Sequence, residues 1–129
     1  MELKEVISIS GKNGLYKVVA RSNKGFIVES IEDKKTKFPV NANHQVALLD
    51  EITIYTNTDE NLPLKTVMDN IEAKRGEGNI PNVKDDTLKI KEFFRTVAPD
   101  YDEERVYVSD MKKILKWFDI LAANQPSES

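Results

Sequence analysis

The spacing of apolar residues changes near residue 57, and this change constrains the fold more than any other feature. Before it, short segments rich in β-branched and aromatic residues are typical of strands, as in LYKVVAR at 15–21 and FIVESI at 26–31. After it, apolar residues recur at helical spacing. We therefore predict an α+β chain, with a β-rich part over 1–57 and a helical part over 58–129.

The β-rich part is predicted to be a small SH3-like β-barrel. The segment SNKG, which ends in Gly25, joins 15–21 to 26–31 as a hairpin connection. KFPV at 37–40 is a strand that Pro39 marks as an edge, and EITIYT at 51–56 is the final strand. Short strands with one apolar face favour a sheet that curls on itself, which predicts the barrel.

Two short helical segments are predicted within the β-rich part. In ELKEVI, the residues Leu3, Val6 and Ile7 have helical spacing, although the ISIS that follows alternates as a strand does. In NANHQVALLD, Asn43 is a suitable N-cap for a helical turn.

Three helices are predicted in the second part, near 62–75, 86–97 and 109–123. The first has Pro63 just inside its start and Gly76 just past its end. Asp85 or Asp86 is expected to cap the second, and Ser109 the third.

Composition limits the class of protein. Of the 129 residues, 40% are hydrophobic and 32% are charged, which is typical of globular chains. There is no cysteine, which excludes thiol catalysis, disulfides and cysteine-based metal sites. Neither a membrane-spanning run nor a signal-peptide pattern is present. We expect a cytoplasmic protein with no membrane partner.

Charge is unevenly distributed along the chain. Residues 1–49 carry eight Lys or Arg and five acidic residues, a balance of +3, whereas the remainder carries eleven and seventeen, a balance of −6. Such asymmetry is compatible with nucleic-acid contact by the first part or with self-association between the two parts. An ordinary solvated surface explains it as well.

The tetrapeptide GKNG, from Gly11 to Gly14, invites comparison with glycine loops that bind phosphates. A KH loop is followed by a helix, but LYKVVAR follows here, and the P-loop spacing is absent. We predict a turn in which Gly11 and Gly14 adopt positive φ.

No group of residues specifies a reaction. His44 is the single histidine and has no carboxylate at ligand spacing, and no serine lies in a nucleophile motif. An acidic cluster lacks the order of a calcium loop and is explained as the start of a helix; it comprises Asp100, Asp102, Glu103 and Glu104. We expect no enzymatic activity, no metal and no cofactor.

The candidate binding residues are basic or aromatic. They are Lys34, Lys35, Lys37, Tyr55 and Trp117. The lysines form a basic stretch on the predicted barrel, and Tyr55 lies on the opposite face from Ile52 and Ile54. Trp117 lies off the apolar stripe of the last helix, so it either covers the barrel or anchors a partner.

Several stretches together resemble a family of small bacterial proteins known only as a domain of unknown function. They are SGKNGLYKVV, GFIVESIED, FPV, HQVALLDEITIYT, LPLKTV and RVYVSDMKKILKWFDIL, which extend over most of the chain. Members often carry proline where this sequence has Asn13. The resemblance implies an SH3-like N-terminal part and a helical C-terminal part, and it implies no activity.

We expect a non-catalytic interaction module that binds another macromolecule, most simply a protein. The alternative is binding of RNA or DNA through the basic barrel face. A structural homo-oligomer that pairs the basic and acidic parts is a third hypothesis.

Overall fold

The computed structural model describes residues 3–12, 14–33, 36–41, 45–75, 80–82 and 84–124. The chain divides into two compact units. The sheet unit comprises Leu3–Glu51 and the end of the last helix from Asp119, and the helical unit comprises Ile52–Phe118. The predicted α+β class is confirmed.

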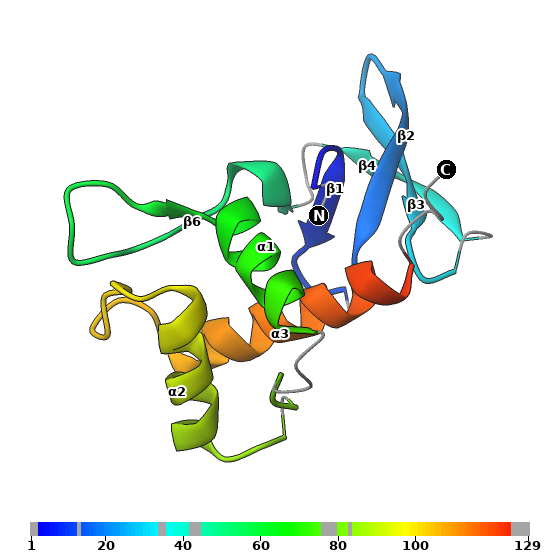
Figure 1. Ribbon diagram of the computed structural model, residues 1–129. Coiled ribbons are helices and arrows are strands. Elements are labelled where there is room, and N and C mark those ends of the chain that lie inside the picture. Colours follow the sequence, from blue (N-terminus) through cyan, green and yellow to red (C-terminus); the bar gives the residue numbers. More distant parts are fainter. Residues whose placement is uncertain are drawn as a thin grey trace. The chain divides into compact units, whose positions relative to one another are not determined.

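The sheet unit contains an antiparallel five-stranded sheet with the order β4-β3-β2-β1-β5 (Figure 1). Its strands are β1 (Val6–Ile9), β2 (Tyr16–Ser22), β3 (Gly25–Ser30), β4 (Lys37–Asn41) and β5 (Val46–Leu48). The predicted hairpin is confirmed as β2 and β3, and Pro39 lies on an edge strand as expected. The sheet is not closed into a barrel, so the SH3-like description is not confirmed.

The expected final strand belongs to the other unit. Within 51–56, only Thr53–Ile54 form a strand, β6, and it pairs with β7 (Leu62–Pro63) in a separate two-stranded sheet. The prediction that this strand completes the barrel is wrong. Its alternating pattern indicated a strand correctly, but such a pattern does not name the strand's partner.

The predicted helix in ELKEVI is also wrong. Glu5 has a φ of 67°, which is incompatible with a right-handed helix, and Val6–Ile9 form β1. Ile7 is paired with Tyr16 on one side and Leu48 on the other. Pairing with the next strand, β2, and with the distant strand β5 outweighs the local helical spacing.

In the segment NANHQVALLD, the described residues after the predicted cap form a strand, and helical structure follows only at the end of the segment. Val46–Leu48 form β5, and a short 3₁₀ helix follows at Leu49–Glu51. The proposed cap Asn43 and the histidine His44 lie outside the residues that the structure describes.

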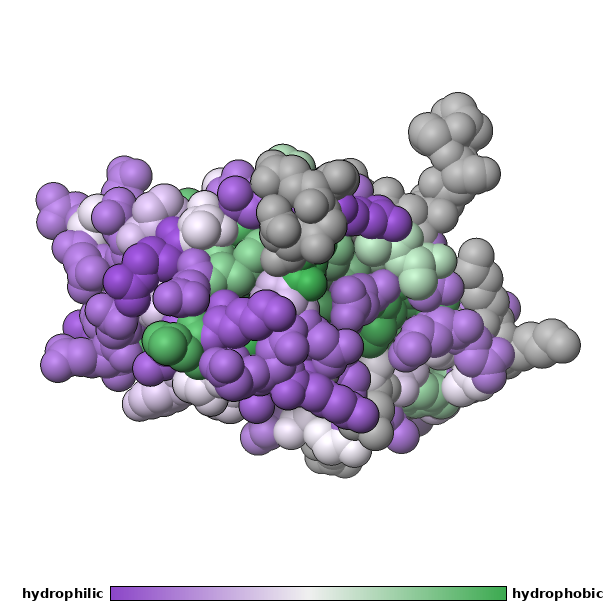
Figure 2. Space-filling view, turned by 60° about the horizontal axis from the view of Figure 1, so that its bottom comes forward, coloured by the Kyte–Doolittle hydropathy of each residue, from purple (hydrophilic) through white to green (hydrophobic). Residues whose placement is uncertain are grey.

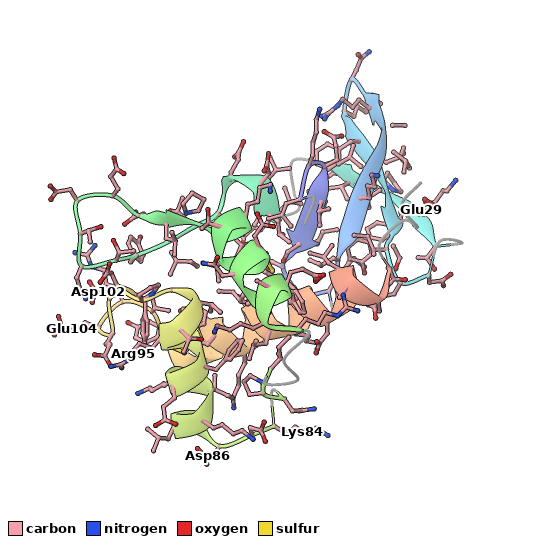
Figure 3. The ribbon with its side chains drawn as sticks, in the orientation of Figure 1. Glu29, Lys84, Asp86, Arg95, Asp102 and Glu104 are labelled. Carbon is pink, nitrogen blue, oxygen red and sulfur yellow. The ribbon has the colours of Figure 1, made fainter. Side chains whose placement is uncertain are left out.

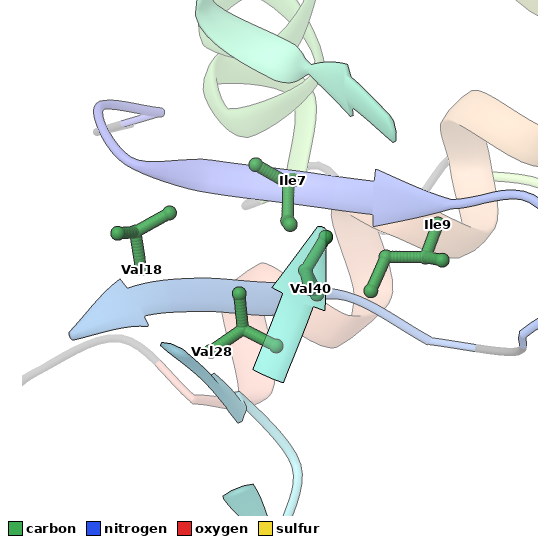
Figure 4. Packing of buried hydrophobic residues seen from close by; sticks show 5 residues of the cluster. All are labelled: Ile7, Ile9, Val18, Val28 and Val40. Carbon is green, nitrogen blue, oxygen red and sulfur yellow. The ribbon is translucent and has the colours of Figure 1, made fainter. Parts of the chain in front are cut away.

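The core of the sheet unit lies on one face of the sheet. Its buried members are Ile7, Ile9, Val18, Val28 and Val40 (Figure 4). The partly buried side chains of Tyr16, Phe26 and Phe38 pack against them. Val40 of β4 lies near Ile7 and Ile9 of β1 in this view, although these strands are not hydrogen-bonded neighbours. Buried residues of β1, β2, β3 and β4 thus contribute to one cluster.

Glycines permit the turns on either side of β2. Gly11 and Gly14 have φ values of +84° and +86°, which confirms their predicted positive φ. Gly25 has a φ of +147° and is more constrained, because a Cβ there would collide with the carbonyl oxygen of Val40. The GKNG segment is thus a turn that leads into β2.

The three predicted helices are confirmed with shifted starts. They are α1 (Leu64–Arg75), α2 (Thr87–Val97) and α3 (Val108–Ala123). Asp86 is the N-cap of α2, and its side chain accepts a hydrogen bond from the Lys89 backbone N–H at 3.0 Å. Pro63 precedes α1 as part of β7 rather than lying in its first turn.

Ser109 does not cap α3, because it lies inside the helix. Instead the Asp110 carboxylate accepts a hydrogen bond from the Tyr107 backbone N–H at 3.0 Å, which is the second half of a capping box. The prediction was wrong because Ser109, a residue type that favours caps, lies two residues after the actual cap position, Tyr107.

Apolar faces of the three helices form the core of the helical unit. The buried side chains are Leu64, Val67, Met68, Ile71, Ile90, Phe93, Phe94, Val97, Met111, Ile114, Leu115 and Phe118.

None of the described helices is long and apolar enough to cross a membrane. Figure 2 shows a face that is mostly hydrophilic, on which hydrophobic side chains emerge in separate small areas.

Candidate interaction surface

Two loops of the helical unit are joined by backbone hydrogen bonds around Tyr55. Thr56, just after β6, forms an isolated antiparallel bridge with Tyr101, in the loop between α2 and α3. The Asn57 N–H donates to the Asp100 carbonyl at 2.8 Å, and the Asp102 N–H donates to the Tyr55 carbonyl at 2.9 Å. These bonds fix the backbone beneath the Tyr55 side chain.

Tyr55 is an exposed aromatic residue next to an arginine. Its residue surface is 47% exposed, and the Arg105 guanidinium carbon lies 5.2 Å from the ring centroid. Arg105 is held in turn by the Asp102 carboxylate, with Nε 3.5 Å from Oδ2. A tyrosine and an arginine in contact on a fixed backbone are the residue types that dominate binding energy at protein interfaces.

A second aromatic and arginine pair lies beneath the first. Tyr101 is 3% exposed, and its ring meets Phe94 edge-on at 5.3 Å. The Arg95 guanidinium lies 5.8 Å from the Tyr101 ring centroid and pairs with Glu103 at 2.9 Å. The nearby Tyr101 hydroxyl, and then the Glu103 carboxylate, raise the pKa of Arg95.

The Tyr101 hydroxyl is buried and has no hydrogen-bond partner among the described residues. The Arg95 guanidinium contacts the face of the Tyr101 ring, and no hydrogen bond joins the two side chains. The buried ring, packed on Phe94, holds this loop against α2.

Acidic residues occur in both of the loops that the bridge joins beside Tyr55. The hairpin loop is held by the Thr56 and Thr58 hydroxyls, which donate to the Glu60 carbonyl at 2.7 and 2.9 Å. Arg95, Asp102 and Glu104 lie together at this end of the unit (Figure 3). We call the following residues the bridge surface: Tyr55, Asp59, Glu60, Asp100, Asp102, Glu104 and Arg105.

The acidic cluster does not form a metal centre in the described part of the chain. No group of three or more histidine, cysteine or acidic side chains there is arranged to hold a metal ion. Asp102 instead accepts a hydrogen bond from the Glu104 N–H at 2.9 Å and pairs with Arg105. The cluster orders a turn and supplies negative charge.

Trp117, the second aromatic candidate, lies on α3 in the helical unit and is half-buried. The Lys113 ammonium lies 5.9 Å from its ring centroid. Lys112, Lys113 and Lys116 lie on the side of α3 opposite the buried residues Met111, Ile114, Leu115 and Phe118. We call these three lysines the lysine face.

The predicted basic stretch is only partly described. Lys34 and Lys35 lie outside the described residues, and Lys37 is exposed on β4. Glu29 on β3 is paired with Lys37 on one side and with Lys17 of β2 on the other (Figure 3). Positive and negative charges therefore alternate across this part of the sheet.

Sequence reasoning found Tyr55 but missed its partners. Arg105 contacts Tyr55, and Tyr101 is bridged to Thr56, both from a loop that is distant in the sequence. No local sequence pattern predicts these contacts. The lysine face was detectable, because Lys112, Lys113 and Lys116 occupy the polar positions between the apolar residues of a predicted helix.

Comparison with known proteins yields domains of unknown function. Residues 52–121 match the model of DUF6852, and residues 3–49 match that of DUF5606, each described as a domain of unknown function. A solution NMR structure from Bacteroides vulgatus, a structural genomics target, is 34% identical with a TM-score of 0.72, covering 98% of this chain and 90% of that chain. No curated protein matches the sequence. The expected resemblance to a family of unknown function is thus confirmed, and because the DUF6852 model spans more than half of the chain, the chain belongs to the DUF6852 family.

Proposed function

We propose that this protein is a non-catalytic interaction module that binds another protein through the bridge surface. The observation that carries the proposal is the exposed Tyr55 ring, held against Arg105 on a hydrogen-bonded backbone. We expect it to act in the cytoplasm, as its cysteine-free composition favours.

Rigidity favours binding at this position. The Tyr55 carbonyl accepts a hydrogen bond from Asp102, and the next residue, Thr56, is bridged to Tyr101. Ordering flexible loops on association opposes binding, so a surface that is already ordered retains more of its contact energy.

Charge indicates the chemistry of the partner. The bridge surface contains five acidic residues and a single arginine, Arg105, which is already paired with Asp102. A partner segment that carries lysine or arginine beside an apolar side chain would complement both the acids and the ring. We therefore propose a basic protein segment as the ligand of this surface.

The non-catalytic role rests on the sequence, which has one histidine, no cysteine and no nucleophile motif. A turnover in a broad hydrolase screen that a single polar substitution abolishes would contradict it.

Affinity purification from the cells that naturally produce the protein tests the proposal. We expect a partner that the wild type recovers and the Tyr55→Ala, Arg105→Ala double variant loses, with affinity at least about 30-fold weaker, as for interface hot spots. Tyr107→Ala is the matched control, because Tyr107 is 63% exposed but outside the bridge surface. Equal recovery by the double variant would exclude the bridge surface.

Nucleic-acid binding through the basic sheet face is the second proposal, and one observation favours it. The Lys12 ammonium lies 4.7 Å from the Phe38 ring centroid, and Phe38 meets Tyr16 edge-on at 5.3 Å, so basic and aromatic groups lie together. Affinity for RNA or DNA that falls steeply with salt and weakens in Lys34→Gln, Lys35→Gln, Lys37→Gln would support it. The alternation around Glu29 makes this proposal the weaker one.

A further inference from the structure

We propose that the basic segment bound by the bridge surface is the lysine face of a second copy of this chain. The inference rests on the proposed function, because it uses the same surface, and it adds the identity of the partner. Contact between two different surfaces of identical chains is heterologous, so association is head-to-tail unless a twofold arrangement closes it.

The lysine face differs from the other basic side chains of the helical unit. Several bases on α1, α2 and the loops have an acidic partner: Lys65 with Asp69 at 3.1 Å, Arg75 with Glu72 at 3.2 Å, Lys89 with Asp85 at 3.6 Å, Arg95 with Glu103 at 2.9 Å and Arg105 with Asp102 at 3.5 Å. Lys112, Lys113 and Lys116 have no ion pair within the described ranges. Lys74, Lys84 and Lys91 also lack one there, but each lies singly.

Helix geometry explains why these lysines are unpaired and adjacent. Met111, Ile114, Leu115 and Phe118 are buried on one side of α3, so the lysines at intervening positions gather on the other side. From Lys112 to Lys116 the face extends about 6 Å along the helix axis. The nearby Asp110 is engaged with the Tyr107 N–H at the helix start.

The bridge surface has the complementary charge. Asp59, Glu60, Asp100 and Glu104 have no ion pair among the residues described, whereas Asp102 is neutralised by Arg105. Unpaired acids and unpaired lysines are therefore separated on two surfaces of one unit. The exposed Tyr55 ring offers a contact for the methylene stems of lysines.

A second copy is the occupant that the charges favour. Every molecule presents both surfaces, and a net charge of −3 opposes contact between copies only weakly. A nucleic acid is less suitable for the lysine face, because 52–118 carries eleven Lys or Arg against thirteen acidic residues. Pairs of exposed charges are individually weak and screened by salt. We therefore expect association at high concentration that weakens as ionic strength rises.

Complementation between two charge-reversed variants tests the inference. The first carries Lys113→Glu and Lys116→Glu, and the second carries Asp100→Lys and Glu104→Lys, all at exposed positions. Sedimentation velocity at low salt should show wild type above the monomer mass of 14.7 kDa and each variant alone at that mass. An equimolar mixture should again exceed it, because each variant keeps the surface that the other lacks.

Controls separate this pairing from a general effect of charge. Lys24→Glu, Lys84→Glu makes the same charge change at exposed turn residues and should associate as wild type does. Circular dichroism verifies the fold of each variant, and Lys113→Gln, Lys116→Gln is the milder substitute if charge reversal unfolds α3.

Three results would overturn the inference: a monomeric wild type at low salt, a mixture that stays monomeric, or a control variant that also dissociates. The proposed function is judged separately. A monomeric wild type that still recovers a foreign partner in a Tyr55-dependent manner refutes self-association and leaves the interaction module intact.

Discussion

The helical unit and the sheet unit differ in how far apart in the sequence the residues lie that determine their local structure. In the helical unit, Asp86 caps α2 by accepting from Lys89, within the same turn. In the sheet unit, the need for glycine at position 25 is set by Val40 on the neighbouring strand. Helix boundaries are therefore determined by residues close to them in the sequence. Strand partners are determined by contacts between segments that only folding brings together.

The interaction surface is an exception within the helical unit. Tyr55 directly follows β6, but its contacts with Asp102 and Arg105 come from the loop between α2 and α3. The helix boundaries follow from the local sequence. The bridge surface, in contrast, depends on the bridge between Thr56 and Tyr101, which are distant in the sequence.

Phe94→Ala should have the largest effect on this comparison. The Phe94 side chain is fully buried in the helical unit, and its loss should lower the free energy of unfolding by about 3–5 kcal/mol. Phe26→Ala in the sheet unit should cost less, since Phe26 is only partly buried. Urea denaturation followed by circular dichroism measures both, and equal losses would contradict the difference in burial.

Gly25→Ala should come next, because it introduces both an unfavourable φ and a collision with the Val40 carbonyl. Gly11→Ala is the matched control: its φ is also positive, but no atom lies within 4 Å of the added Cβ. We expect about 1 kcal/mol for Gly11→Ala and a clearly greater loss for Gly25→Ala. Similar melting temperatures for the two variants would show that the contact with Val40 is not limiting.

The extent of successful prediction follows the same division. Asp86 and the apolar spacing of α1, α2 and α3 were readable from sequence, as were the β2–β3 hairpin and the positive φ of Gly11 and Gly14. The prediction for β1 was wrong because its helical spacing is a local pattern, whereas its strand state depends on pairing with β2 and with the distant β5. On the bridge surface, Tyr55 was identified because it lies on the face opposite Ile52 and Ile54 in an alternating segment. Arg105 could not be identified without knowing that Thr56 and Tyr101 are bridged.

Asp86→Ala tests the local side of the comparison. Removing this N-cap should cost about 1 kcal/mol, because the Lys89 N–H loses its side-chain acceptor. Ser109→Ala should cost much less, since Ser109 lies inside α3 and alanine favours helices. If thermal unfolding showed the opposite order, the assignment of the α3 start would be wrong.

Asp119→Asn should have the smallest effect. Asp119 is an exposed residue, but partial desolvation of its carboxyl group raises its pKa, so the folded state binds the proton more tightly than the unfolded chain does. The contribution of Asp119 to the free energy of unfolding is therefore present at acidic pH and is lost as the pH rises through the raised pKa. The variant should melt slightly above wild type at neutral pH and not at acidic pH, with Asp59→Asn as control for the lost charge; a pH-independent difference would contradict the burial effect.

The register shift between Val18 and Ala20 has a consequence for chain length. Val18 is paired with Val28 and Ala20 with Ile27, so Val19 is the extra residue of a β-bulge. A chain shortened by Val19 would keep the pairing of every later residue in β2 and would lose the local bend. Deletion of Val19 would therefore leave the inside and the outside of the sheet unexchanged.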